Sequence, residues 1–206
     1  MNETRFTQPA IFAFEYAMSR LLHSFGVTFD KVAGHSFGEV AALVVAEALS
    51  LEDACRLVVA RGQLSGDLPT GQGAMAVVEG ADQDIVAFIA GLADGVTVAA
   101  YNSPSVIVLS GQAEEIAKLT TAEEVNKCTV RALPISHAFH SDMMVPMVPR
   151  YQAVLQELSF SALKTPMVSS VTGKPIDDMA DWPGYFTDHL LGPIHFNDVM
   201  TEITGD

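Results

Sequence analysis

The segment Gly34-His35-Ser36-Phe37-Gly38-Glu39 restricts the fold of this chain more than any other stretch of its sequence. An apolar run over residues 27–33 precedes it, and a helical pattern over residues 39–49 follows it. A strand, a tight turn carrying a serine and then a helix form the context that a G-x-S-x-G nucleophile elbow requires. Gly34 and Gly38 suit this turn because a side chain at either position would crowd the strand against the helix. The five-residue pattern also occurs by chance, but its context favours a serine nucleophile with an exposed hydroxyl, and therefore an enzyme that handles acyl groups.

Composition narrows the class of protein and its partners. A length of 206 residues suits one domain, or one domain with an insert. The 25 acidic and 11 basic residues give a net charge of −14, which disfavours nucleic acid and anionic membranes as partners. Cys55 and Cys128 lie far apart without a C-x-x-C, as expected for reduced thiols. The sequence has neither an 18-residue apolar run nor a basic-then-apolar leader, so we expect a cytoplasmic protein without a membrane span. We also expect no metal site and no bound cofactor.

The remaining pattern alternates between helices and strands. Helices are predicted over 8–25, 51–64, 143–158 and 182–191, and a strand over 167–171. Ser50, with Asp53 three residues later, predicts a capping box at the start of the second of these helices. Between them lies the order strand, helix, strand, strand, helix, strand, at 74–78, 83–92, 96–101, 106–109, 113–125 and 129–133. This order is that of a split ferredoxin-like unit, which we predict as an insert over 72–137 in a core formed by 1–71 and 138–206.

A serine nucleophile needs a base, and six histidines are available. His23 and His195 are interpreted as structural or surface residues. His35 adjoins Ser36, but neighbours in a tight turn point apart. His137 and His140 follow the last strand of the insert, where the chain re-enters the core. For either one, the roles of general base and of satisfied loop histidine remain open.

Several motifs, taken in order, resemble those of the acyltransferases that load malonyl units onto acyl carrier proteins. This family includes malonyl-CoA:acyl-carrier-protein transacylases and the acyltransferase domains of polyketide and fatty acid synthases. The motifs are Thr7-Gln8-Pro9-Ala10, the elbow GHSFGE, Arg61-Gly62, Gly73-Ala74-Met75, Asn102-Ser103-Pro104, His137-Ala138-Phe139-His140 and His189-Leu190-Leu191-Gly192-Pro193-Ile194. Ser36 and His140 are separated by 104 positions (140 − 36), which leaves room for the whole insert between them.

The resemblance implies an α/β-hydrolase-like core with a nucleophile elbow, and it implies roles for individual residues. Ser36 would attack a thioester carbonyl, and His140 would act as the base. The Phe37 N–H would be an oxyanion donor, and Arg61 would hold the malonyl carboxylate. A backbone carbonyl at His189 would orient the catalytic histidine. Further substrate-binding positions implied by the resemblance are His35, Asn102, His137, Phe139 and Met144.

The substrates implied by the resemblance are malonyl-CoA and the phosphopantetheine thiol of an acyl carrier protein, with other synthase domains as possible neighbours. The family pairs the sequence HAFH with malonyl and Tyr-Ala-Ser-His with methylmalonyl, so Phe139 implies malonyl. The family also begins with a strand and a glutamine-bearing turn that supplies an oxyanion contact, and it ends with a further strand. Neither matches this chain, so we expect a fragment that is poorly soluble or weakly active alone.

Two other classes of protein remain open. A serine esterase or thioesterase would use the same elbow, but it would need an acidic partner for the histidine and no carboxylate-binding arginine. A non-catalytic docking fragment of a synthase is the second alternative, although Ser36, Arg61 and His140 are all present. Without the resemblance, Arg61 would be interpreted as the solvated end of a helix.

Overall fold

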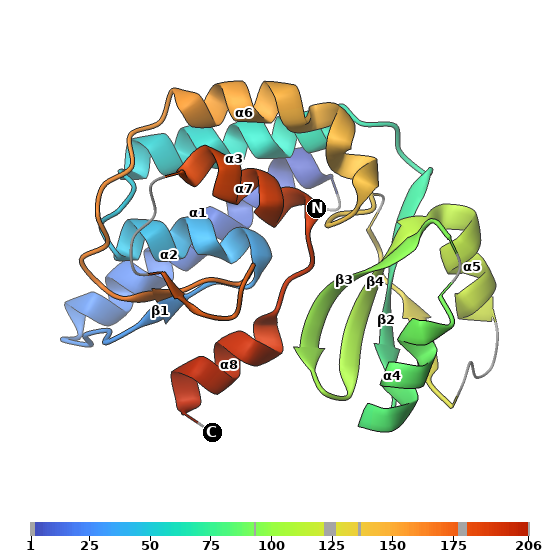
Figure 1. The fold of residues 1–206 in the computed structure, drawn as a ribbon. Helices are drawn as coiled ribbons and strands as arrows, with labels where there is room; N and C mark the ends of the chain where they lie inside the picture. Colours follow the sequence, from blue (N-terminus) through green and yellow to red (C-terminus); the bar gives the residue numbers. More distant parts are fainter. Residues whose placement is uncertain (1–2, 93, 122–126, 136, 177–180, 206) are drawn as a thin grey trace.

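The computed structural model describes residues 3–92, 94–121, 127–135, 137–176 and 181–205, and its elements form two regions that lie side by side (Figure 1). The larger region contains α1 (Thr4–Ser24), β1 (Val32–Ala33), the 3₁₀ helix η1 (Ser36–Gly38), α2 (Glu39–Val45), α3 (Leu51–Gly66), the 3₁₀ helix η2 (Asp142–Met147), α6 (Val148–Gln156), β6 (Met167–Val168), β7 (Pro175–Ile176), α7 (Trp182–Leu191) and α8 (Phe196–Thr204). The smaller region contains β2 (Gly73–Glu79), α4 (Asp82–Ala90), β3 (Val96–Ser103), β4 (Val106–Gln112), α5 (Ala113–Thr121) and β5 (Thr129–Ala132). The chain enters the smaller region once and leaves it once, as an insertion does.

The smaller region has the predicted ferredoxin-like topology. Its four strands are antiparallel and lie in the order β3-β4-β2-β5, so the two central strands are not neighbours in sequence. Helices α4 and α5 lie beside this sheet, and α5 contacts β2, β4 and β5 (Figure 1). Their apolar faces close a separate core with the strands, formed by buried residues that include Ala76, Val78, Ile85, Phe88, Ile107, Leu109 and Ile116. The last part of the helix predicted over 113–125 lies outside the described residues.

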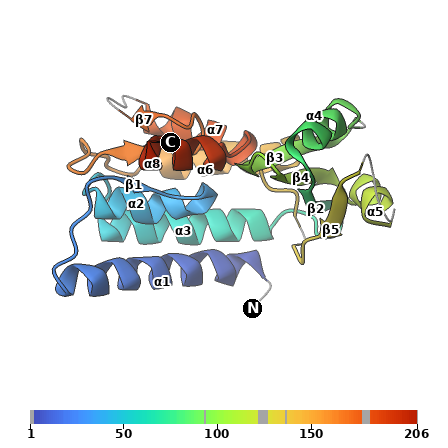
Figure 2. The same ribbon diagram turned by 90° about the horizontal axis from the view of Figure 1, so that it is seen from below.

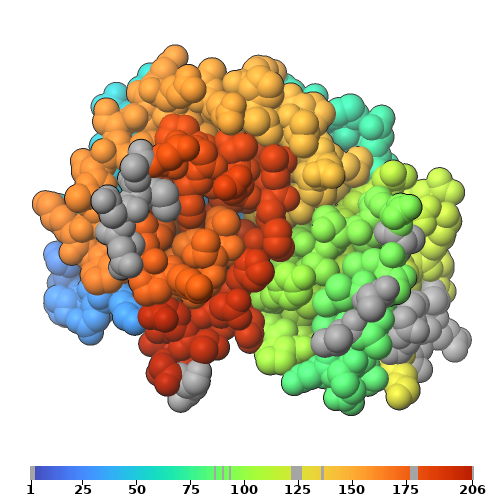
Figure 3. All heavy atoms as spheres, in the orientation of Figure 1, coloured from blue at the N-terminus to red at the C-terminus, as the bar shows by residue number. Residues whose placement is uncertain are grey.

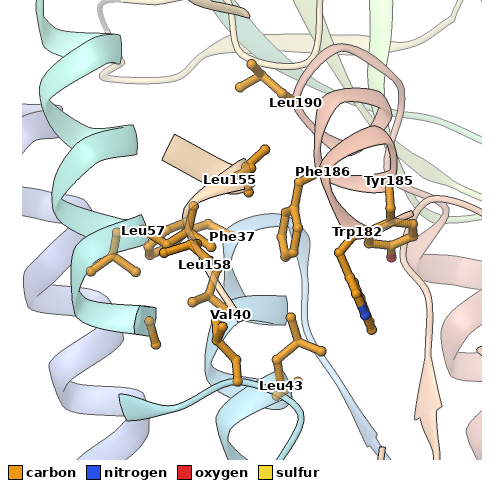
Figure 4. Packing of buried hydrophobic residues seen from close by; sticks show 14 of the residues in the cluster. Phe37, Val40, Leu43, Leu57, Leu155, Leu158, Trp182, Tyr185, Phe186 and Leu190 are labelled. Atoms are coloured by element: carbon orange, nitrogen blue, oxygen red, sulfur yellow. The ribbon is translucent and has the colours of Figure 1, made fainter. Parts of the chain in front are cut away.

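The larger region is a small sheet surrounded by helices. β1 pairs with β6 in parallel, and β6 pairs with β7 antiparallel. Figure 2 shows the elements as layers, with α1 outermost, then α3 and α2, then β1, and α6 to α8 on the other side. The interior is apolar, and side chains from α2, α3, α6 and α7 meet in it (Figure 4). The turn that carries Ser36 therefore stands on a packed core.

Both predicted strands of the core are shorter than their apolar runs. Pairing through β1 begins at Val32, whose N–H donates to the carbonyl of Pro166, and covers two residues. The strand predicted over 167–171 is likewise reduced to β6. The Ser169 N–H donates to the carbonyl of Lys174, and the chain turns there into β7. Apolar composition alone does not set strand length, since ladder pairing requires a partner.

Two predicted helices end early or divide for identifiable reasons. The helix predicted over 39–49 ends at Val45, because Glu47 has a positive φ of 58° and the N–H groups of Ala48 and Leu49 turn back to the carbonyl of Leu43. The helix predicted over 143–158 divides into η2 and α6. Pro146 lies in η2 and Pro149 at the start of α6, and each lacks the N–H that would continue the helical bonding.

Other helices follow the prediction closely. α7 has the predicted bounds, and α3 begins at the predicted cap, where the Asp53 N–H donates to Ser50 Oγ at 3.0 Å. α1 begins four residues earlier than expected, and α8 and β7 are additional elements that the sequence pattern did not reveal. Cys55 is exposed whereas Cys128 is buried in the smaller region.

The two regions are joined by backbone hydrogen bonds along the edge strand β3. The Tyr101 N–H donates to the carbonyl of Ile194 at 2.8 Å, and the Ile194 N–H donates to the carbonyl of Ala99 at 2.9 Å. Ile194 lies between α7 and α8, and the surface view shows this late part of the chain against the small sheet (Figure 3). The segment that follows α7 is therefore held by both regions.

Candidate active site

Ser36 lies in a strained turn between β1 and α2. Its φ is +50°, in the left-handed region that residues other than glycine rarely adopt. The turn is also very tight, because a Cβ added at Gly34 would come within 2.1 Å of the Glu39 backbone nitrogen. Such strain in a non-glycine residue tends to occur at functional sites. The predicted strand–turn–helix geometry is confirmed, with a short 3₁₀ turn preceding α2.

His140 contacts this serine directly. Its Nε2 lies 2.6 Å from Ser36 Oγ, although the two residues are 104 positions apart. Its Nδ1 lies 3.1 Å from the carbonyl oxygen of Gly192, directly after α7. A carbonyl can only accept, so Nδ1 carries the proton and Nε2 accepts from the serine hydroxyl. His140 also has a positive φ, of 59°, so both ends of the pair are in strained conformations.

Burial keeps this histidine neutral. The pKa of His140 is lowered to about 3, first because burial disfavours the imidazolium and second because of the positive charge of Arg61. The Gly192 carbonyl opposes this shift by accepting from Nδ1. A neutral imidazole that accepts a hydrogen bond from a serine is the arrangement required of a general base.

Arg61 is a buried cation in the same site. Its side chain projects from α3 and is 3% exposed, and its Nη1 donates to Gln8 Oε1 at 2.7 Å. The guanidinium carbon lies 5.2 Å from the centre of the Phe37 ring and 5.8 Å from that of Phe139. Within the described part of the chain, no carboxylate forms an ion pair with it. Burial lowers its pKa, but a guanidinium remains charged near neutral pH.

These groups line a cavity of about 460 Å³ between the two regions. One wall carries Ser36, His140 and Arg61. The opposite wall is mostly apolar and comes from the small sheet and the segment after it, with residues that include Met75, Ala100, Val108, Leu133 and Ile135. A reactive hydroxyl, a neutral base and a buried cation thus share an apolar cavity, which can bind and activate an acyl group that carries a negative charge.

Comparison with known proteins identifies the family. The family model of the acyl transferase domain matches residues 1–205. The chain belongs to the acyl transferase domain family. It is 41% identical to the polyketide synthase GfsA of Streptomyces halstedii over 207 aligned positions, which cover 100% of this chain and 3% of GfsA.

Solved acyltransferase structures have the same fold. The acyltransferase domain from the second module of the salinomycin polyketide synthase is 40% identical, with a TM-score of 0.89, over 99% of this chain and 48% of that one. The malonyl CoA-acyl carrier protein transacylase of Clostridium perfringens is 29% identical, with a TM-score of 0.89, over 99% of this chain and 66% of that one. The present chain spans about half the length of the solved polyketide synthase domain. The predicted fold class is confirmed by these similarities.

Two carbonyls at the end of α7 act on His140. The 3.1 Å contact of Nδ1 is with the carbonyl of Gly192, three residues after the predicted position at His189. The backbone of His189 also raises the pKa of His140, less than that of Gly192 does. The end of α7 leaves the His189 carbonyl free, because the last helical bond runs from the Gly192 N–H to Asp188 and Pro193 has no N–H.

Two residues predicted to bind substrate do not line the cavity. Met144 is fully buried in the core of the larger region, because η2 directs it inward. Asn102 lies outside the cavity lining, and its Oδ1 is 2.8 Å from Nε2 of His35. Asn102 therefore contacts His35, which does line the cavity.

The other predicted residues lie at the cavity. His137 and Phe139 both line it, and their rings are 5.9 Å apart. The Nε2 of His137 lies 3.4 Å from the carbonyl of Leu68, which is in the loop between α3 and β2. His140, in contrast, contacts Ser36. Phe37 follows Ser36 directly, and its ring packs beneath Arg61. The structure thus brings these residues to one cavity, and it brings His140 rather than His137 to Ser36.

The sequence reasoning missed Gln8 as a site residue. Gln8 lines the cavity, accepts from Arg61 and donates from Nε2 to Thr4 Oγ1 at 2.7 Å. A signal was present, because Gln8 lies four residues before the buried Phe12 and thus on the buried face of α1. A polar side chain on such a face needs a buried partner.

Groups of three or more possible metal-binding side chains are absent from the described residues. Among these residues, too, none of the helices combines the length and the apolarity needed to cross a bilayer.

Proposed function

We propose that this chain transfers a malonyl group from coenzyme A to the phosphopantetheine thiol of an acyl carrier protein through an ester on Ser36. The observation that carries this proposal is the chain of contacts Ser36–His140–Gly192 beside the buried Arg61. The similar protein of Clostridium perfringens is a malonyl CoA-acyl carrier protein transacylase, and GfsA is a polyketide synthase. The pathway is accordingly the synthesis of polyketides or fatty acids, with other synthase domains as neighbours.

The first half of the reaction forms the ester. Ser36 Oγ attacks the thioester carbonyl while His140 Nε2 takes the hydroxyl proton. The Phe37 N–H stabilises the negative oxygen that develops, and Gly192 holds the imidazolium through Nδ1. The carbon–sulfur bond then breaks, and His140 returns the proton to the coenzyme A sulfur. The second half repeats these steps in reverse, with the carrier thiol attacking the ester and Ser36 recovering its proton.

A serine hydrolase is the alternative with the same first step. It differs in the second step, where water would attack the ester. The apolar wall of the cavity and the cation beside the serine favour a bound dicarboxylic acyl group over access of bulk water. A non-catalytic docking fragment would have no need for a strained serine in contact with a neutral histidine.

Intact-protein mass spectrometry tests the proposal. Incubation with malonyl-CoA should add the mass of one malonyl group, and peptide mapping should place it on Ser36. When phosphopantetheinylated carrier protein is added, the malonyl group should leave Ser36, and the mass of the carrier protein should rise by one malonyl group. Loss of the group to water at the same rate with and without carrier would support the hydrolase instead, and an adduct on another residue would refute the assignment.

Replacement of Arg61 by alanine should lower the preference for malonyl-CoA over acetyl-CoA. A buried charge-assisted pair contributes about 1.5–3 kcal/mol, or on the order of 10- to 10²-fold in the ratio of the two kcat/KM values. Arg61→Lys should recover part of the ratio, because lysine keeps the charge but loses the planar fork. Arg150→Ala, which removes an exposed partner of Asp67, is the control. An unchanged ratio in Arg61→Ala would remove Arg61 from substrate binding.

Phe139 predicts discrimination at the α-carbon of the acyl group. Its ring lines the cavity beside Arg61, where a methyl branch on the malonyl group would have to fit. Apolar pockets distinguish such small groups by roughly 1–3 kcal/mol, so malonyl-CoA should be used about 10- to 10²-fold faster than methylmalonyl-CoA. Phe139→Ala should lower this ratio of the rates with malonyl-CoA and methylmalonyl-CoA. Competition between the two thioesters measures it, and preference for methylmalonyl would contradict the prediction.

The rate of Ser36 acylation should not depend on pH at weakly acidic pH. His140 acts in its neutral form, and its pKa of about 3 keeps it neutral well below the ordinary histidine range. The rate of coenzyme A release in single turnovers should therefore change little between about pH 8 and about pH 5. Circular dichroism at each pH verifies that the protein remains folded. A rate that falls by half near about pH 6.5 would show an unperturbed histidine instead.

A further inference from the structure

Glu39, the last residue of the elbow motif, has a buried carboxyl group that the acyl-transfer steps do not use. It is fully buried at the start of α2, three positions after Ser36. The Ser170 N–H donates to its Oε1, and the Tyr185 hydroxyl lies 2.7 Å from Oε2 and 2.9 Å from Oε1. Ser169 Oγ lies 2.8 Å from the same hydroxyl. One carboxyl thus connects α2 to the end of β6 and to α7.

These contacts reach His140 in two ways, through the backbone around Gly192 and through the ring of His189. Tyr185 is on α7, and Gly192, directly after that helix, supplies the carbonyl that accepts from His140 Nδ1. The Ser170 carbonyl accepts from the His195 N–H at 2.7 Å, so the segment containing Gly192 is held on both sides. His189, also on α7, has its Nε2 3.8 Å from Glu39 Oε2 and its ring edge-on to that of His140, 5.9 Å between centres.

Burial of the Glu39 carboxyl group is energetically unfavourable, so packing alone does not explain this residue. Burial raises the pKa of Glu39 to about 7, which reflects the cost of placing an ionisable group in the core. An apolar side chain of similar size would avoid that cost, but it would leave the Ser170 N–H and the Tyr185 hydroxyl without this acceptor. The carboxyl is therefore best explained by the groups that it holds.

We propose that Glu39 is a positioning residue of the acyl-transfer site. Its carboxyl fixes Tyr185 and the backbone of Ser170, and through them the Gly192 carbonyl, so that His140 keeps its proton on Nδ1 and its Nε2 on Ser36. This inference rests on the proposed function for its kinetic consequence, whereas the tautomer of His140 is a property of the free protein.

Two variants of the intact protein test the contact. Tyr185→Phe removes the hydroxyl and keeps the ring, which packs edge-on against Trp182 and Phe186. Glu39→Ala removes the carboxyl itself. Each should slow acylation of Ser36 by about 10- to 10²-fold with little change in KM, because a small misplacement of a catalytic group costs about that much. If Glu39→Ala does not fold, Tyr185→Phe decides the question.

Two controls separate positioning from general stability. Glu39→Gln keeps an acceptor for the Ser170 N–H and can donate to the Tyr185 hydroxyl, so it should recover most of the rate. Leu43→Ala opens a cavity in the core one turn later on α2, so it should lower the melting temperature and leave kcat nearly unchanged. If Leu43→Ala slows acylation as much as Tyr185→Phe does, the loss of rate reflects a general loss of stability, and the proposal is wrong.

A second readout does not depend on turnover. Nitrogen-15 NMR of labelled histidine should show a single tautomer of His140 in the wild-type protein, with the proton on Nδ1, and a mixture of tautomers in Tyr185→Phe and Glu39→Ala. If the wild-type protein forms no Ser36 adduct, the proposed function fails while this measurement still tests the positioning. If both variants keep the wild-type tautomer, or acylate at the wild-type rate, Glu39 is not a positioning residue.

Discussion

Replacement of Ser36 by alanine should abolish both the malonyl adduct and transfer to the carrier protein. Alanine lacks the hydroxyl that attacks the thioester, and loss of a serine nucleophile lowers kcat by on the order of 10⁶-fold in a serine enzyme where it has been measured. Alanine differs from serine by one atom, so it can keep the positive φ of the elbow at a similar cost. The measurement is mass spectrometry of the protein after incubation with malonyl-CoA, together with transfer of radiolabelled malonyl to the carrier.

An exposed thiol provides the control for this variant. Cys55 is exposed and could exchange with a thioester without any help from the site. Cys55→Ala should therefore keep the adduct and the transfer activity, whereas Ser36→Ala should lose both. An adduct that persists in Ser36→Ala, or that disappears in Cys55→Ala, would show that Ser36 is not the nucleophile.

Elements whose signals are local could be predicted well from the sequence. α7 has the predicted bounds, and the Ser50 cap of α3 was visible as a capping box. The ferredoxin-like order of strands and helices followed from alternating periodicities. The elements that differ depend on distant partners. β1 has only two residues because pairing, rather than apolar composition, sets its length, and prolines divide the helix predicted over 143–158.

The site divides in the same way. Ser36 could be predicted from its turn, and Arg61 was identified from the family resemblance. The Gly192 carbonyl and Gln8 were missed, because their roles arise from tertiary contacts with His140 and Arg61. Sequence spacing also could not separate His137 from His140, since both follow the last strand of the insert. Only two residues separate the two histidines, yet the ring of His137 faces the Leu68 carbonyl and that of His140 faces Ser36.

Replacement of His140 by alanine should slow acylation of Ser36 by roughly 10²- to 10⁴-fold, the usual contribution of a positioned general base. The physical reason is the 2.6 Å contact with Ser36 Oγ, which gives the hydroxyl proton a neutral acceptor. Rapid mixing with malonyl-CoA and detection of released coenzyme A measures this rate. The residual rate should rise with pH, because hydroxide can replace the missing base.

The matched variant is His137→Ala, three positions earlier on the same loop and also at the cavity. Its Nε2 lies near the Leu68 carbonyl, and its ring packs beside Phe139, so its loss should affect binding of the acyl group more than proton transfer. We expect His137→Ala to change KM by a modest factor and to slow acylation much less than His140→Ala does. If His137→Ala is the more damaging substitution, the base is His137, and the close contact of His140 with Ser36 would have to be a property of the free protein that substrate binding rearranges.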